Sequence, residues 1–268
     1  MHDLWPTILL GIIEGLSEFL PISSTGHLLV AEHWLGERSE TFNIFIQLGA
    51  VLAVCLIYKE RLSGFFFLWK NREKLPYFLK LFVAFIITSI LGLWVKKMGW
   101  ELPKDLGPVI IAIFGGAFWI YFAEKVSSQR QSFVEEISWP TAIAVGASQV
   151  IAGILPGFSR SAATILMAVL LGVSRPAATE FAFLLGIPTM FAASLFAWIE
   201  ETYLLKNPSL DSPLTLATGF CVSAVVAFIS VKWLLSYIQT HTFIPFVWYR
   251  VGLGFFLIAL VASGWKTQ

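Results

Sequence analysis

The chain has 268 residues, of which 57% are apolar, 15% aromatic and only 13% charged. Soluble domains carry roughly 25% charged residues, and the mean hydropathy here is +0.78, so the composition excludes a disordered chain, a disulfide scaffold and an ordinary cytosolic enzyme. It indicates an integral membrane protein. The formal net charge of +1 gives no sign of a nucleic-acid partner. Cys55 and Cys221 lie within apolar runs, and we interpret both as packing residues.

Apolar runs follow one another along the whole chain. Six are long enough, or nearly so, to cross a bilayer core about 30 Å thick: 43–58, 77–95, 106–123, 181–199, 214–235 and 245–264. Four others are short or broken: 4–20, 24–35, 139–155 and 161–173. No basic segment precedes the first run and two glutamates interrupt it, so we expect it to belong to the mature protein and not to a signal peptide.

The short runs form two pairs, and a Pro-Ser loop divides each pair. The loops are LPISS at 20–24 and LPGFS at 155–159. Short paired segments around such a breaker are typical of re-entrant half-helices, which dip into the membrane and return. Placing Pro21 on Pro156 aligns Ser24 with Ser159, and a further match needs a shift two residues larger. The two pairs are therefore a weak but consistent internal repeat.

Each half of the chain, 1–135 and 136–268, then holds one re-entrant pair and three spans. An odd number of spans makes the second half enter from the opposite side, so the repeat is inverted. Two loops that enter from opposite faces can meet near the middle of the bilayer. We therefore predict an all-α fold with a single integral membrane domain over 1–268. It is a polytopic helix bundle with six spanning helices plus two re-entrant half-helix pairs in an inverted-topology repeat.

Basic residues beside the spans favour an orientation with both termini outside, by nine residues to six. The inside set is counted with the segment 59–76 taken as cytoplasmic. It consists of Lys59, Arg61, Lys70, Arg72, Lys74, Lys125, Arg130, Arg175 and Lys232, and the outside set of Arg38, Lys96, Lys97, Lys104, Lys206 and Lys266.

Charged side chains inside apolar segments cost about 2.5–3.5 kcal/mol each on insertion scales, and by default they indicate function. Four of them gather at the two Pro-Ser loops. The full set is Glu14, Glu18, His27, Glu32, Arg160, Glu180 and Arg250. We assign no catalytic role to Glu32, Glu180 and Arg250, which are candidates for structural partners.

Glu14 and Glu18 are four residues apart, so they share one face of the first half-helix. Like charges this close repel each other unless a cation or a proton sits between them. The spacing therefore fits a divalent metal site or an acid/base pair. The alternative is a pair of surface carboxylates at a frayed terminus.

The helix after the first loop opens with hydroxyl groups and a glycine. Ser23, Ser24, Thr25 and Gly26, together with free backbone amides at a helix N-terminus, form a ready anion site. His27 follows them and can transfer a proton near neutral pH. A lone histidine in an apolar chain is more often a hydrogen-bonded core residue, but His27 shares its segment with two carboxylates and three hydroxyls.

The second loop places Arg160 between Ser159 and Ser161 at the start of another half-helix, with Gly157 just before them. Arginine suits phosphate because its planar fork donates two parallel hydrogen bonds. A snorkelling arginine is the alternative, but Arg160 lies far from both ends of its apolar segment. One loop thus supplies carboxylates, hydroxyls and a histidine, and the other supplies a phosphate clamp. Together they indicate a phosphoryl-transfer site inside a membrane.

At these residues the chain resembles a known family. The segments EGLSEFLPISSTGH at 14–27 and PGFSRS at 156–161 are similar to the two signatures of undecaprenyl-pyrophosphate phosphatases, bacterial membrane enzymes of the bacitracin-resistance type. The resemblance implies hydrolysis of undecaprenyl pyrophosphate to undecaprenyl phosphate and inorganic phosphate, which recycles the lipid carrier for peptidoglycan synthesis. It also implies a divalent cation, Mg²⁺ or Ca²⁺, and a multi-pass protein of the bacterial plasma membrane whose active site opens to the outer face.

Carried over by position, the resemblance implies a role for each loop residue. Glu14 and Glu18 match the acidic pair and would hold the metal. The catalytic set is Glu18, Ser24, His27 and Arg160, and the substrate-binding set is Thr25, Gly26, Gly157, Ser159 and Ser161. In our hypothesis Ser24, aided by His27, attacks the terminal phosphorus, or a water does so instead. The sequence leaves the nucleophile open, and it also leaves open whether the protein is a homodimer.

Two rival functions deserve comparison. A transporter also uses inverted repeats with broken helices, and it would need Arg160 and the loop amides. It would have less use for carboxylates, a histidine and serines that converge on one phosphate. The other lipid-phosphatase superfamily, related to phosphatidic acid phosphatases, needs Ser-Arg followed by five residues and then a histidine, counted here from Ser159-Arg160. Leu166 occupies that place, which excludes this reading.

Overall fold

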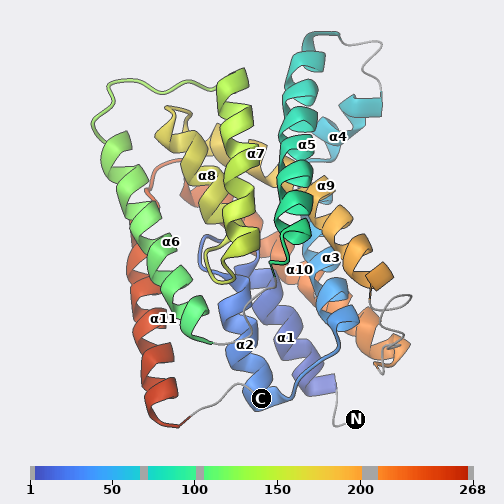
Figure 1. The fold of residues 1–268 in the computed structure, drawn as a ribbon. Helices are drawn as coiled ribbons and strands as arrows, with labels where there is room; N and C mark the ends of the chain where they lie inside the picture. Colours follow the sequence, from blue (N-terminus) through green and yellow to red (C-terminus); the bar gives the residue numbers. More distant parts are fainter. Residues whose placement is uncertain (1–3, 67–71, 101–105, 201–210, 265–268) are drawn as a thin grey trace.

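The structure is a computed structural model that describes residues 4–66, 72–100, 106–200 and 211–264 (Figure 1). All regular secondary structure in these ranges is helical, and no β-strand occurs among the described residues. In chain order the helices are α1 (Leu4–Ser17), α2 (Ser24–Leu35), α3 (Glu40–Ile57), α4 (Lys59–Phe66), the 3₁₀ helix η1 (Arg72–Lys74), α5 (Leu75–Lys97), α6 (Leu106–Ser127), α7 (Trp139–Ile154), α8 (Arg160–Leu170), α9 (Arg175–Ile199), α10 (Pro213–Tyr237) and α11 (Ile244–Ala262).

Six helices are long and apolar enough to cross a membrane, namely α3, α5, α6, α9, α10 and α11. They coincide with the six predicted long runs, so the all-α fold of a multi-pass membrane protein is confirmed. Helix α4 was not expected from the sequence, because its residues KERLSGFF are too polar and too few to form a span. Lys70, Lys104, Lys206 and Lys266 of the orientation count lie outside the described residues.

The two pairs of short helices occupy opposite halves of the molecule. In Figure 1, α1 and α2 lie in the lower half and α7 and α8 in the upper half, with the long helices around them. The connecting loops meet between the pairs, where Ser161 Oγ donates a hydrogen bond to the Leu20 carbonyl oxygen over 3.0 Å. The predicted contact between the two loops is thereby confirmed.

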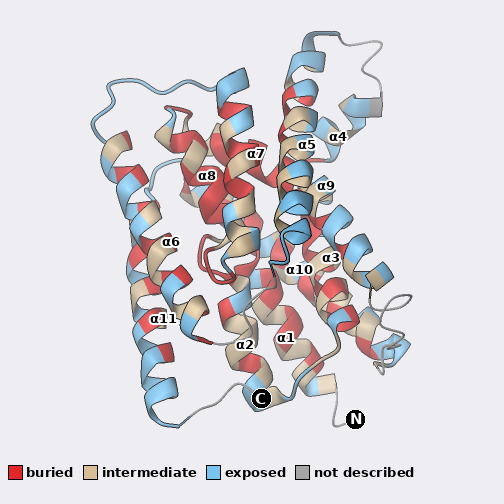
Figure 2. Cartoon of the chain, in the orientation of Figure 1, coloured by how far each residue is buried: buried red, intermediate tan, exposed pale blue. Residues whose placement is uncertain are grey.

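Burial follows this arrangement. The two loops and most of α8 are buried, whereas α5, α6 and α11 expose their outer faces (Figure 2). The most apolar window of α5 is only 17% buried inside the protein, against 50% for α3. Helix α5 therefore offers most of its apolar side chains to lipid, while α8 lies inside the bundle and brings its first residue, Arg160, to the centre.

Small residues let the helices approach one another closely. Gly49 of α3 lies against the backbone carbonyl of Phe220 on α10, and Gly15 of α1 lies against that of Ser223 on the same helix. A Cβ atom at either glycine would overlap the α10 backbone. Lipid tails are as apolar as the helices, so close van der Waals packing has to supply the association that water would otherwise drive.

Gly49→Ala should lower the free energy of unfolding by about 1–3 kcal/mol, because the added methyl group overlaps the Phe220 carbonyl group and forces two packed helices apart. Gly252→Ala on α11 is the matched control, since no atom lies within 4 Å of its added Cβ. The apparent melting temperature of the detergent-solubilised protein measures both effects. Equal melting temperatures for the two variants would contradict the packing described.

Candidate active site

Helices α2 and α8 are each preceded by an N-cap serine with an unusual backbone. Ser23 has φ 75° and Ser159 has φ 76°, and in the described part of the chain no other residue except glycine has positive φ. The left-handed region costs an L-residue on the order of 1–2 kcal/mol. Each hydroxyl caps its helix by accepting a backbone N–H, from Gly26 over 3.2 Å and from Ala162 over 3.3 Å. Backbone strain of this kind clusters at functional sites.

The two caps correct the register of the internal repeat. Ser23, and not Ser24, occupies the position equivalent to Ser159, so the alignment made from Pro21 and Pro156 is off by one residue here. Ser24 and Arg160 are consequently the first residues of α2 and α8. A hydroxyl and a guanidinium thus stand at equivalent helix starts.

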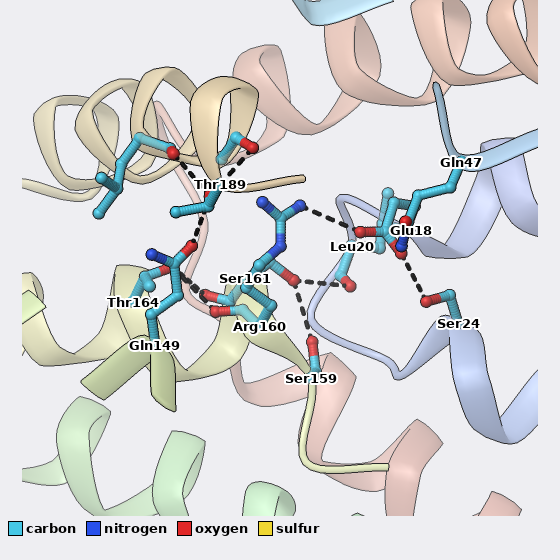
Figure 3. Close-up of polar contacts among 12 residues, drawn as sticks. Glu18, Leu20, Ser24, Gln47, Gln149, Ser159, Arg160, Ser161, Thr164 and Thr189 are labelled. Atoms are coloured by element: carbon cyan, nitrogen blue, oxygen red, sulfur yellow. Dashed lines mark hydrogen bonds and ion pairs between the residues drawn. The ribbon is translucent and has the colours of Figure 1, made fainter. Parts of the chain in front are cut away.

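Glu18 lies between Ser24 and Arg160 (Figure 3). Arg160 Nη2 is 3.0 Å from Glu18 Oε1, and Ser24 Oγ donates a hydrogen bond to Glu18 Oε2 over 2.6 Å. The Glu18 side chain is 6% exposed and that of Arg160 is 19% exposed. A carboxylate within hydrogen-bond reach of a serine can accept the serine proton and activate the oxygen as a nucleophile.

A cavity of about 610 Å³ adjoins these three side chains. Six of the predicted site residues line it: Glu18, Ser24, Thr25, Gly157, Ser159 and Arg160. Its remaining wall is largely apolar and includes Phe85 and Leu93 of α5 and Met190 and Phe196 of α9. The volume falls within the range of roughly 300–1,000 Å³ for small-molecule sites. A polar end joined to an apolar wall suits an anionic headgroup attached to a hydrocarbon chain.

The serines of the second loop help to hold it in place. Ser159 Oγ and Ser161 Oγ are 3.0 Å apart, and Ser161 in turn donates to Leu20 (Figure 3). Ser161 therefore joins the two loops and does not line the cavity. Gly157 has φ +101°, and a Cβ there would overlap the carbonyl of Val109, so both the turn and its close approach to α6 require glycine.

His27 contacts the backbone at the start of α2 and a side chain of α11. Its Nδ1 is 2.6 Å from the carbonyl oxygen of Ser23, and its Nε2 is 2.6 Å from the hydroxyl of Tyr249. A carbonyl can only accept, so Nδ1 carries the proton and Nε2 accepts from Tyr249. The two rings are also stacked, with centroids 5.6 Å apart. The neighbour of the Ser24 hydroxyl in this structure is Glu18, and His27 holds α2 against α11.

The predicted cation site involves Glu14 and Glu18. Their carboxylates lie close enough for the two charges to repel each other. Glu14 is 2% exposed and its Oε2 has no hydrogen-bond partner, so this oxygen fits a hard cation. Glu18 fits less well, because Arg160 and Ser24 occupy its two oxygens. Within the described ranges, no group of three or more His, Cys, Asp or Glu side chains is arranged to hold a metal.

Sequence reasoning missed a polar chain along the cavity wall. Gln149 Nε2 donates to Thr88 Oγ1 over 3.0 Å, and Thr189 Oγ1 donates to Gln149 Oε1 over 3.1 Å. All three residues line the cavity, as does Gln47 of α3. An amide inside an apolar run is the pattern that could have identified Gln47 and Gln149.

Arg250 of α11 contacts the backbone of both loops. Its guanidinium donates to four backbone carbonyls, those of Pro21 (3.3 Å), Ala112 (3.2 Å), Ile113 (3.1 Å) and Gly157 (2.9 Å). The residue is 0% exposed, and no carboxylate of the described residues pairs with it. Carbonyl dipoles thus replace the water that a buried cation has lost.

The two remaining charges of the sequence analysis lie apart from the 610 Å³ cavity. Glu180 pairs with Arg61 over 3.2 Å and accepts a hydrogen bond from Tyr77 over 3.4 Å, so its partners are structural. Glu32 lies on α2, where its carboxylate contacts Asn43 of α3.

The chain matches the family model of the bacitracin resistance protein BacA over residues 7–256. It is 96% identical over 268 residues to undecaprenyl-diphosphatase of Methylacidiphilum infernorum (isolate V4), with 100% of each chain covered. It is 51% identical over 257 residues to undecaprenyl-diphosphatase of Rhizobium etli (strain CIAT 652), with 96% of each chain covered. Undecaprenyl-diphosphatase of Xylella fastidiosa (strain 9a5c) is 47% identical over 264 residues, which are 96% of this chain and 98% of the relative.

Arg250→Lys should lower the apparent melting temperature clearly, because a single ammonium cannot reach all four carbonyls and each buried group left unpaired costs about 1–3 kcal/mol. Arg130→Lys is the control, since Arg130 is exposed and its Nη2 donates to one carbonyl, that of Leu170, over 2.8 Å. Thermal unfolding in detergent compares the two. A loss no larger in Arg250→Lys than in Arg130→Lys would refute the role given to the buried guanidinium.

Proposed function

This chain belongs to the bacitracin resistance protein BacA family, and we propose that it hydrolyses undecaprenyl pyrophosphate to undecaprenyl phosphate and inorganic phosphate. The reaction returns the lipid carrier to peptidoglycan synthesis and confers bacitracin resistance. The observation that carries the proposal is the contact of Ser24, Glu18 and Arg160 at the polar end of one cavity. At this point the two loops bring together a nucleophile (Ser24), its base (Glu18) and a ligand for phosphate (Arg160).

The diphosphate headgroup binds at the meeting point of the loops. The Arg160 guanidinium faces the cavity and keeps donors that Glu18 does not use. A Cβ at position 186 would overlap this guanidinium, so Gly186 provides the space in which it lies. The first amides of α2 and α8, with Thr25 and Ser159, offer further donors to phosphate oxygens.

The chemical step transfers the terminal phosphoryl group. Ser24 Oγ attacks the terminal phosphorus while its proton passes to Glu18 Oε2, over the 2.6 Å hydrogen bond already present. The bond from this phosphorus to the bridging oxygen breaks, and undecaprenyl phosphate leaves. Water then hydrolyses the phosphoserine and releases inorganic phosphate. In the alternative course, a water activated by Glu18 attacks the phosphorus directly.

A divalent cation, Mg²⁺ or Ca²⁺, is part of the proposal, and Glu14 is the residue best placed to hold it because Oε2 is buried without a partner. Such an ion supplies charge neutralisation at the diphosphate.

The isoprenoid chain leaves the cavity between α5 and α9, whose apolar side chains form its wall. A cavity of about 610 Å³ holds the headgroup and the first isoprene units, and the rest of the chain lies among membrane lipids. All proposed site residues come from one chain, so the reaction does not depend on whether two copies pair as a homodimer.

We place the protein in the bacterial plasma membrane with the cavity open to the outer face. The cavity reaches Lys96 and Phe196, near the ends of α5 and α9 that the basic-residue count assigns to the outside. In this arrangement the pairs α1/α2 and α7/α8 are re-entrant and the two halves form an inverted repeat. The matching caps Ser23 and Ser159 and the opposite placement of the pairs support it.

Transport without chemistry explains these contacts less well. An anion or lipid transporter would use Arg160 and the helix N-termini. It would gain nothing from the hydrogen bond between Ser24 and Glu18, which serves a proton transfer.

Arg160→Ala should reduce phosphate release from a short prenyl pyrophosphate in detergent by about 10³-fold or more, the scale of arginine contributions to phosphoryl transfer. Arg61→Ala is the control, because this half-exposed arginine pairs with Glu180 away from the cavity. Both variants should remain folded. Near-normal turnover in Arg160→Ala would remove the arginine from phosphate binding.

The serine mechanism predicts a phosphorylated enzyme. Rapid quenching during turnover should trap phosphate on Ser24, and Ser24→Ala should abolish both the trapped species and turnover. Mass spectrometry of the quenched protein identifies the modified residue. If Ser24→Ala loses turnover and no phosphoserine is trapped in the unaltered protein at any time, the direct attack by water is the correct course.

A further inference from the structure

The 610 Å³ cavity has a second cation on its wall, far along it from Arg160. Within the part of the chain that the structure describes, the charged residues that line this cavity are Glu18, Arg160 and Lys96. Glu18 and Arg160 contact each other at the buried end. Lys96 lies in the last turn of α5, and its side chain is 49% exposed. The chemical step proposed above makes no use of this lysine.

Lys96 joins α5 to α9 at the exposed end of the cavity. Its Nζ is 2.7 Å from Oε2 of Glu200, the residue that caps the C-terminus of α9. The same Nζ lies over the Phe196 ring, 4.1 Å from its centroid. Phe196 lines the cavity with Lys96 and is 44% exposed. We call this end, formed by Lys96 and Phe196, the cavity mouth. It lies between the two helices that the isoprenoid chain passes in the proposed function.

The partner of Lys96 at the mouth can be exchanged. The Lys96 and Glu200 side chains are 49% and 38% exposed, and ion pairs between exposed side chains contribute little to stability. A diphosphate carries more negative charge than one carboxylate and presents more acceptor oxygens to an ammonium group. A lysine also has a flexible four-carbon stem that can follow a new partner. An anionic headgroup at the mouth can therefore displace Glu200.

The mouth and the buried end lie too far apart for one headgroup to occupy both as the side chains stand. Gly186 lies against the Arg160 guanidinium, and Phe196 lies under Lys96. Both residues belong to α9, and their separation in sequence corresponds to about 15 Å along a helix. A diphosphate is shorter than this. A headgroup that enters through the mouth therefore meets Lys96 before it meets Arg160.

We propose that Lys96 is an entry site for the diphosphate headgroup at the cavity mouth. The ammonium group leaves Glu200, binds the headgroup oxygens and passes the headgroup inward to Arg160. The inference rests on the proposed function and deepens it, because it names a residue that acts before the chemical step. Glu200 has the opposite effect, since it competes with the headgroup for the same ammonium group.

A purely structural role for Lys96 makes a different prediction. A lysine in the last turn of a helix also offsets the negative end of the helix dipole, and its pair with Glu200 ties two helices together. If only this pair matters, then removing either partner has the same effect. If Lys96 receives the headgroup, the two substitutions act in opposite directions, because one removes the cation and the other frees it.

The association rate of a substrate analogue tests the proposal. The probe is a fluorescent short prenyl methylenediphosphonate, whose bridging carbon cannot be hydrolysed, mixed with the full chain in detergent by stopped flow. Lys96→Gln should lower the association rate constant about tenfold at low salt, the lower end of electrostatic effects on association. Glu200→Gln should raise it, and Lys96→Arg should retain it. These differences should largely vanish in about 1 M salt, where the screening length is about 3 Å.

Lys97→Gln is the matched control, because Lys97 is the next residue, is exposed and does not line the cavity; its rate should equal that of the unaltered protein. An unchanged rate in Lys96→Gln would overturn the proposal, as would an equal fall in Lys97→Gln or in Glu200→Gln. Phosphate release is assayed separately. The expected rates without phosphate release in the unaltered protein would contradict the phosphatase proposal alone, whereas phosphate release with no effect of Lys96→Gln on association would contradict the entry site alone.

Discussion

The buried guanidinium of Arg250 is the interaction on which the site depends. It joins the carbonyls of Pro21 and Gly157, which belong to loops more than a hundred residues apart, and fixes both to α6. Loop carbonyls inside a membrane need donors that water cannot supply, and the guanidinium provides several at one point. Non-helical backbone is therefore stable at the centre of the bundle, where Ser24, Glu18 and Arg160 contact one another.

Two strained serines add to this constraint. Ser23 and Ser159 give up a favourable backbone conformation, and each then caps a helix whose first side chain contacts Glu18. These first side chains are Ser24 and Arg160, which we propose as the nucleophile and a phosphate ligand. The two helix starts thus share a local geometry and carry different first residues.

The two carboxylates of the first loop, Glu14 and Glu18, lie one helical turn apart but have different surroundings. Glu18 has both oxygens engaged by Ser24 and Arg160, while Glu14, one helical turn earlier, keeps one buried oxygen without a hydrogen-bond partner. Their helical spacing predicted a common site. The tertiary structure decides that Glu18 lines the 610 Å³ cavity and Glu14 does not.

By itself, the sequence determined the membrane class, the six spans and the two loops that carry Glu18, Ser24 and Arg160, because apolar run length and buried charge are local properties of a chain. Only the tertiary structure decided that His27 contacts Tyr249, that Arg250 joins the loops and that Gln149 lines the cavity. These partners are distant in sequence. Their contacts arise from helix packing, in which close approach at positions such as Gly49 selects among many pairings that the residue pattern alone allows.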